Sequence, residues 1–274
     1  MTSTIQIPAG TIRFRELGAG PPIVFVHGLL VDGRLWDAVL PHLTDHRLIV
    51  PDWPLGSHHS ALAASADLTP PGLARVVADF LAALDLDDVT LVANDTGGAI
   101  AQLVVTRYPQ RIRRLVLTNC DAYENFLPPI FRPLQFAARV PGLAPVLLSA
   151  MRSERLRNLP ITFGGLSSTR IDPALTADWL EPARVDPAVR RDLVKVLRGI
   201  SNRYTIEAAR ELGKFGGATL IAWGRDDPYF KPRYAEQLAT EFSDVRLEWI
   251  DGARAFVPLD QPARLAELIT AFTS

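Results

Sequence analysis

The sequence predicts an α/β fold in which a mostly parallel sheet is flanked by helices and carries a helical insertion. Short apolar runs alternate with helix-like segments along the chain, and such alternation is typical of parallel sheets with helices on both faces. The 274 residues suit one α/β domain with an insertion. A hydrophobic fraction of 48% supports a large core and argues against disorder.

Each element has its own signal in the chain. Two short β-like runs close together suggest an opening hairpin, continuous apolar runs suggest buried strands, and apolar residues at helical spacing mark an early helix. The expected elements, in order, are the hairpin 5–7 and 12–14, the strands 23–26 and 48–50, the helix 72–84, the strands 89–93, 115–117, 220–223 and 245–250, and a helix after Pro262.

The composition changes between residues 122 and 213, where prolines recur and amphipathic helical stretches replace strands. We interpret residues 122–213 as a helical cap, and residues 1–121 and 214–274 as the main domain. The cap is expected over the C-terminal edge of the strands, where α/β sheets bind ligands. Its aromatic residues Phe126 and Trp179 could line a pocket for a hydrophobic substrate, although core packing explains them equally well.

Bulk properties exclude several function classes. A net charge of −1 gives no reason to expect a nucleic acid or a membrane surface as partner. We see no signal peptide and no apolar segment long enough to span a bilayer, so a cytoplasmic protein is expected. The single cysteine, Cys120, excludes an internal disulfide. No metal site and no cofactor are expected, because His58 and His59 lack suitable ligand partners. The oligomeric state stays open.

Asp95 is the most informative residue of the chain. It follows the apolar run 89–93 and precedes Thr96-Gly97-Gly98, so it stands at a tight turn between a strand and a helix. Such a turn lifts the side chain off the sheet, and the unpaired N–H groups of the new helix favour an anion there. The simpler interpretation is that Asp95 only caps the helix.

Four landmarks together resemble the α/β-hydrolase superfamily over essentially the whole chain. They are His27-Gly28 after a strand, the Asp95 turn, the run 223–228 and the closing run 256–258. The turn resembles the nucleophile elbow of that family, with Asp in place of Ser as in haloalkane dehalogenases and epoxide hydrolases. The resemblance implies that Asp95 attacks an electrophilic sp³ carbon and forms an alkyl–enzyme ester.

The resemblance also implies an acid and a base. Asp227 matches the triad acid, and Asp121 is a second acid position that ranks below it. The family places its catalytic His where this chain has Ala255. Three explanations compete: an engineered His-to-Ala trap mutant, a natural loss of hydrolysis, or a substitute base. His58 is the best candidate substitute, because its loop follows the strand 48–50, but it also reads as a solvated loop histidine.

The remaining site expectations concern the oxyanion hole and the groups that bind the leaving group. The backbone N–H groups of Leu29 and Thr96 are the expected oxyanion-hole donors. Dehalogenases commonly place halide-binding Trp or Asn side chains at these two positions, so Leu29 and Thr96 weaken the dehalogenase interpretation. Epoxide hydrolases use tyrosines of the cap to protonate the opening oxygen, and Tyr123 and Tyr204 could serve.

The expected function is hydrolysis through Asp95 of an epoxide-like hydrophobic small molecule, ahead of an alkyl halide. The alternative from another class is a non-hydrolytic or catalytically impaired protein that binds or rearranges a small hydrophobic ligand. A plain ester hydrolase is a weaker alternative, because it would normally have Ser at position 95. Position 255 discriminates the first two, since a native His would support the hydrolase and a native Ala the alternative.

Overall fold

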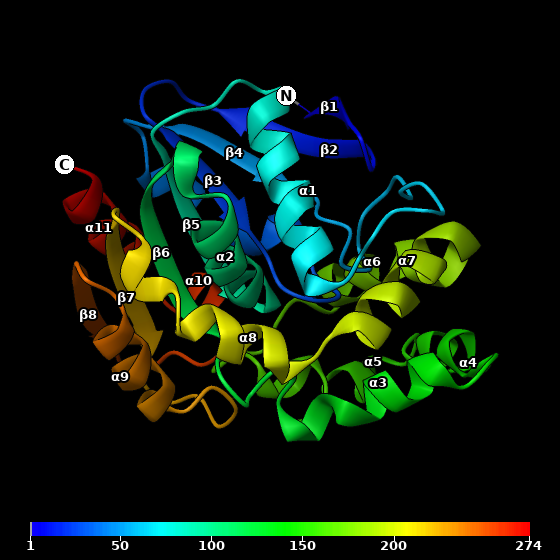
Figure 1. Ribbon diagram of the computed structural model, residues 1–274. Helices are drawn as coiled ribbons and strands as arrows, with labels where there is room; N and C mark the ends of the chain where they lie inside the picture. The colour runs from blue at the N-terminus through cyan, green and yellow to red at the C-terminus, as the bar shows by residue number, and fades with distance from the viewer. Residues whose placement is uncertain (1) are drawn as a thin grey trace.

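Eight strands form one sheet in the order β1-β2-β4-β3-β5-β6-β7-β8 (Figure 1). The computed structural model describes residues 2–274. The hairpin β1–β2 is antiparallel and so is the β2–β4 pair, whereas all pairs from β4 to β8 are parallel. The strands are β1 (Thr2–Ile7), β2 (Gly10–Leu17), β3 (Pro22–Val26), β4 (Arg47–Pro51), β5 (Val89–Asp95), β6 (Ile112–Cys120), β7 (Ala218–Gly224) and β8 (Val245–Ile250). The predicted mostly parallel α/β sheet is confirmed.

Helices cover both faces of this sheet. On one face, α1 and α2 pack side by side, and α11 lies on the opposite face (Figure 1). The predicted early helix is α1, whose residues Leu73, Val77 and Phe80 are buried. The helices outside the insertion are α1 (Pro70–Ala83), α2 (Thr96–Arg107), α9 (Pro232–Glu241), α10 (Val257–Asp260) and α11 (Pro262–Thr273).

The segment between β6 and β7 is helical and, within the described residues, contributes no strand to the sheet. Most of its helices lie beyond one end of the sheet, and α8 lies beside α2 (Figure 1). We refer to residues 122–213 as the cap; these boundaries stay a prediction. The helices are α3 (Arg132–Arg139), α4 (Leu143–Ala150), α5 (Glu154–Arg157), α6 (Pro173–Val185), α7 (Pro187–Gly199) and α8 (Asn202–Ala209). No helix in residues 2–274 is long and apolar enough to cross a membrane.

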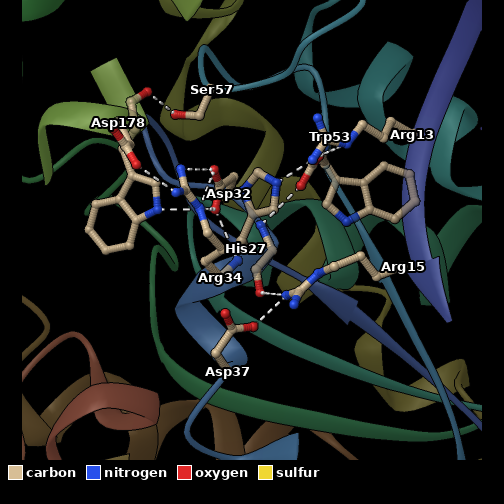
Figure 2. Close-up of polar contacts among 12 residues, drawn as sticks. Arg13, Arg15, His27, Asp32, Arg34, Asp37, Trp53, Ser57 and Asp178 are labelled. Carbon is tan, nitrogen blue, oxygen red and sulfur yellow. Dashed lines mark hydrogen bonds and ion pairs between the residues drawn. The ribbon is translucent and has the colours of Figure 1, made fainter. Parts of the chain in front are cut away.

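A buried carboxylate fastens the cap to the loop that follows β3 (Figure 2). One oxygen of Asp32 accepts the indole N–H of Trp179 at 3.1 Å, and the other binds the Arg34 guanidinium at 2.8 Å. Arg34 continues to Asp178 at 2.9 Å. The Ser57 hydroxyl adds a bond of 2.6 Å to the carbonyl of Trp179. These contacts fix α6 against the main domain.

Asp32→Ala should therefore destabilise the protein. The substitution leaves the Trp179 indole N–H and part of the Arg34 guanidinium without an acceptor inside the structure. The expected loss in free energy of unfolding is about 2–4 kcal/mol, measured by urea unfolding. Asp178→Ala is the matched control: its side chain is 61% exposed, so it should cost no more than about 1 kcal/mol. Equal losses would contradict the central role of Asp32.

Candidate active site

Asp95 lies at the turn between β5 and α2, in a backbone conformation that favours glycine. Its φ is +55° and its side chain makes no capping hydrogen bond to α2. One carboxylate oxygen accepts the Leu29 N–H at 3.2 Å, and the nearby Thr96 N–H favours the ionised form of the carboxyl. Non-glycine residues at positive φ cluster at functional sites, because the surrounding structure must hold them there. The geometry thus favours a functional role for Asp95 over a helix cap.

Glycines make room for this carboxylate. A Cβ atom on Gly28 would lie 2.0 Å from the Asp95 Oδ2, and one on Gly98 would lie 2.3 Å from the Cys120 Cβ. The first position lets the β3 loop place the Leu29 amide on the carboxylate. The second lets α2 pack closely against β6. Any side chain at either position would force the elbow apart.

His27 holds the same loop. Its Nε2 accepts the backbone N–H of Trp53 at 2.8 Å, and its Nδ1 lies 2.9 Å from the carbonyl of Gly28. Burial lowers the pKa of His27, so the neutral ring fits these two contacts. His27 therefore orients the loop that carries Leu29, and neither ring nitrogen is free to act on Asp95.

A cavity of about 150 Å³ opens above Asp95. Asp95 is the only ionisable side chain among the residues that line it. Thr162 is the other polar side chain, and its hydroxyl binds backbone carbonyls of its own segment. Leu and Ala dominate the walls, which come from the β3 loop and the cap: Leu29, Leu30, Leu127, Phe131, Leu134, Ala137, Ala138, Ala144, Leu147, Leu148, Met151, Ile161, Phe163, Leu166, Leu180, Leu193 and Leu197.

This apolar setting changes the titration of Asp95. Burial raises the pKa of the Asp95 carboxyl to about 7, although the amides of Thr96 and Leu29 favour its ionised form. The nearby charge of Asp227 raises the pKa further. Near neutral pH the group therefore exists in both forms, which suits either a nucleophile or a proton donor.

Asp227 follows β7 and is held by three donors. The backbone N–H groups of Tyr229 and Phe230 bind one oxygen at 2.7 and 3.2 Å, and the Asn119 amide binds the other at 2.9 Å. Burial raises the pKa of Asp227 to about 6, against these hydrogen bonds. The structure thus gives the expected triad acid an ordered place beside Asp95, without an imidazole to orient.

Ala255 lies next to the strand that carries Asp95. The side-chain amide of Asn94 donates to the Ala255 carbonyl at 2.7 Å and to the Asn119 carbonyl at 3.1 Å. Asn94 and Asn119 thus connect position 255, Asp95 and Asp227. Ala255 itself is fully buried and does not line the cavity. Sequence reasoning missed both asparagines, although a polar residue inside an apolar strand was an available signal.

Asp121 lies behind the elbow. It is fully buried, one oxygen accepts the Thr96 hydroxyl at 3.1 Å, and the other has no hydrogen-bond partner. Burial and the charge of Asp95 raise the pKa of Asp121 well above its usual range. A neutral Asp121 that supports Thr96 fits these contacts better than an ionised triad acid.

His58 does not meet Asp95 in any contact of the structure. Its Nδ1 accepts the Gly56 N–H at 3.3 Å, and its Nε2 lies 3.4 Å from the carboxylate of Asp192 in α7. Its side chain is buried rather than solvated. The expectation of a substitute base is therefore corrected: His58 joins a main-domain loop to the cap, and both ring nitrogens are occupied there.

None of the four expected substrate contacts lines this cavity. Trp179 bonds to Asp32 and packs against Phe163 and Phe256. Phe126 and Tyr123 are buried in the core, and the Tyr123 hydroxyl has no hydrogen-bond partner. Tyr204 packs beneath the guanidinium of its neighbour Arg203. Leucines and Phe163 provide the cavity wall instead. Within residues 2–274, no cluster of His, Cys, Asp and Glu could hold a metal ion.

Comparison with known proteins identifies the family. A model of the alpha/beta hydrolase fold matches residues 21–262, so the chain belongs to the α/β-hydrolase family. Haloalkane dehalogenase 2 of Mycobacterium tuberculosis is 28% identical over 266 residues, which cover 95% of this chain and 90% of that protein. The 2-hydroxy-6-oxo-2,4-heptadienoate hydrolase of Pseudomonas putida is 38% identical over 126 residues, which cover 41% and 42%.

A solved structure agrees on the fold. The haloalkane dehalogenase DatA of Agrobacterium tumefaciens superposes with a TM-score of 0.79 at 22% identity, over 99% of this chain and 96% of that chain. Such a likeness at low identity shows the fold alone. The two curated relatives named above are a dehalogenase and a hydrolase.

The raised pKa of Asp95 predicts how pH affects stability. Because the unfolded carboxyl loses its proton near pH 4 and the folded one near pH 7, folding is opposed increasingly as the pH rises between these values. Asp95→Asn removes this penalty. The difference in free energy of unfolding between Asp95→Asn and wild type should therefore grow by roughly 1–4 kcal/mol, in favour of the variant, as the pH goes from 4 to 8. Urea unfolding at each pH measures this, and the exposed Asp244→Asn should show no comparable trend.

Proposed function

We propose that this member of the α/β-hydrolase family uses Asp95 as a nucleophile on an electrophilic sp³ carbon of a small hydrophobic molecule. One carboxylate oxygen accepts the Leu29 amide, and the other oxygen is the one that attacks. The observation that carries the proposal is that Asp95 is the one ionisable group in the wall of an apolar cavity.

The step balances without a cofactor. The free oxygen of Asp95 forms a bond to carbon while the carbon–oxygen bond of an epoxide or the carbon–halogen bond of an alkyl halide breaks. An alkoxide then takes a proton from water, whereas a halide leaves as the ion. The ester's carbonyl oxygen stays on the Leu29 amide, which would also stabilise the oxyanion of a later hydrolysis.

The cavity limits the size of the substrate. Its volume of about 150 Å³ is close to that of an apolar cavity that stays dry and binds benzene. We therefore expect a compact apolar ligand of about benzene's size. The preference for an epoxide over an alkyl halide rested on Leu29 and Thr96, which lack halide-binding side chains, and on the cap tyrosines Tyr123 and Tyr204, which do not line the cavity. The dehalogenase relatives support testing alkyl halides beside epoxides.

The absence of a base and of a proton donor favours a second, non-hydrolytic candidate function. Position 255 offers no imidazole, and the cavity wall offers no free side-chain donor for a leaving group. The alternative is a protein that binds or rearranges a small hydrophobic ligand without hydrolysis. Here Asp95 would act as a proton donor or acceptor, for which a pKa of about 7 is suited.

Incubation with reactive epoxides and alkyl halides should give a persistent single adduct on Asp95. Attack needs a positioned carboxylate, but release needs an activated water that Ala255 cannot supply. Intact-protein mass spectrometry should show the full mass of an epoxide, or that of a halide less HX, on the peptide containing Asp95. The rate should rise with pH through about 7, as Asp95 ionises. Asp95→Asn should abolish the adduct. Saturable binding with no mass change across the panel would favour the second candidate.

Ala255→His should convert the adduct into turnover, because the new imidazole would lie in the region of Asp227. A general base typically contributes ~10²–10⁴-fold, so ester release should accelerate on that order. Ala255→Leu is the matched control: it adds similar bulk without a base and should leave the adduct stable. Both changes overpack a buried site at a cost of about 1–3 kcal/mol, so thermal unfolding is measured beside turnover. Unchanged release in a folded Ala255→His protein would contradict the assigned position of the base.

A further inference from the structure

Exposed apolar side chains concentrate on one part of the cap. Nine large hydrophobic residues are exposed among those described, and all but Leu17 and Val185 lie within residues 130–161. Phe136, Val146 and Ile161 are the most exposed of that segment, at 66%, 61% and 55%. Isolated exposed apolar residues are common, but such concentration marks an interaction surface. We call the exposed side chains of residues 130–161 the outer cap face.

The helix α3 has two distinct sides, one toward the cavity and one that belongs to the outer cap face. Phe131, Leu134 and Ala138 line the cavity on one side of the helix. Arg132, Phe136 and Arg139 are exposed, and their spacing of four and three residues places them together on the opposite side. In α4, likewise, Leu147 and Leu148 line the cavity while Val146 is exposed. Each helix thus has an inner apolar side and an outer side that exposes a large apolar side chain.

Charge decides which partner fits this face. Residues 130–161 contain five arginines and one acidic residue, Glu154, in a chain whose net charge is −1. Glu154 pairs with Arg170, and Arg157 is buried with its guanidinium on backbone carbonyls and a Thr hydroxyl. The other four arginines are exposed and make no ion pair within the described structure: Arg132, Arg139, Arg152 and Arg155.

We propose that the outer cap face docks on an anionic phospholipid surface. Apolar side chains flanked by arginines are what interfacial helices present to such a surface, with the guanidinium groups at the phosphates and the apolar groups in the acyl boundary. A second copy of this chain fits less well, because it would bring four further unpaired arginines against the first four. The absence of a spanning helix is compatible with this mode, in which helices lie in the plane of the surface.

Docking would connect the cavity to the lipid phase. The helices α3 and α4 separate the cavity from the outer cap face, and Ile161 belongs to both, since it lines the cavity and is 55% exposed. α3, α4 and α5 lie together at the end of the cap farthest from the sheet (Figure 1), so a bilayer could contact them without meeting the main domain. Apolar ligands that partition into membranes would then be offered close to the cavity wall.

The test is flotation of the intact protein with vesicles of phosphatidylcholine alone or mixed with phosphatidylglycerol. Wild type should float only with the anionic vesicles, less as salt is raised. Arg132→Glu with Arg139→Glu should weaken partition at least about tenfold, and Phe136→Ser with Val146→Ser should also weaken it. The matched control for the charge variant is Arg210→Glu with Lys231→Glu, at two exposed positions outside the outer cap face. The matched control for the apolar variant is Leu17→Ser with Val185→Ser. Both controls should float like wild type.

Three outcomes would overturn the proposal: no flotation, equal flotation with neutral vesicles, or equal losses in the control variants. Sedimentation of the protein without lipid tests the alternative that the outer cap face binds a second copy of this chain. A wild-type dimer that the Arg132→Glu, Arg139→Glu variant dissociates, with no vesicle binding, would assign the face to self-association and refute docking on lipid. Asp95→Asn should float like wild type, so this result does not depend on the proposed chemistry.

Discussion

The burial of one carboxylate at the end of β5 constrains the rest of the site. Asp95 loses water on entering the core, and the Leu29 amide is the donor it gains across the sheet. That amide reaches Asp95 because β3 and β5 run parallel and in register, with Val26 opposite Ala93, and because Gly28 leaves room. A positive φ costs on the order of 1–3 kcal/mol, and the burial adds to it. Strained, buried residues of this kind are found mainly at functional sites. This favours a functional role for Asp95 over a role as a helix cap.

Hydrogen bonds from the cap hold the loop that contains Ala255. The Phe256 N–H donates to the Leu166 carbonyl at 2.8 Å, and the Ser168 hydroxyl donates to the Gly252 carbonyl at 2.8 Å. The cap is therefore bonded directly to this loop. Asp227 has three hydrogen-bond donors of its own, and its charge raises the pKa of Asp95. In this arrangement Asp227 influences the titration of Asp95 without an imidazole between them.

The sequence predicted those parts of the site whose contacts are local in the chain, and missed those whose partners are far apart in the chain. The elbow is local: a strand, a turn and two glycines within one short run specify where Asp95 points. The order of strands then placed Asp227 and Ala255 at the same sheet edge. The cap could not be read this way, because helix periodicity shows which side is apolar but not what it faces. Trp179 and His58 illustrate this, since their partners Asp32 and Asp192 lie 147 and 134 residues away.

A pKa near 7 is no obstacle to nucleophilic attack by Asp95. At neutral pH it removes about half of the ionised form, a factor of two. Against that, the apolar wall of the cavity offers few polar groups that would stabilise the carboxylate and weaken it as a nucleophile. The same wall offers no side chain that could activate a water molecule for the next step. The architecture therefore favours forming a bond at Asp95 over breaking it again. Reversible proton transfer at Asp95, which needs no water, is the other chemistry that this cavity supports.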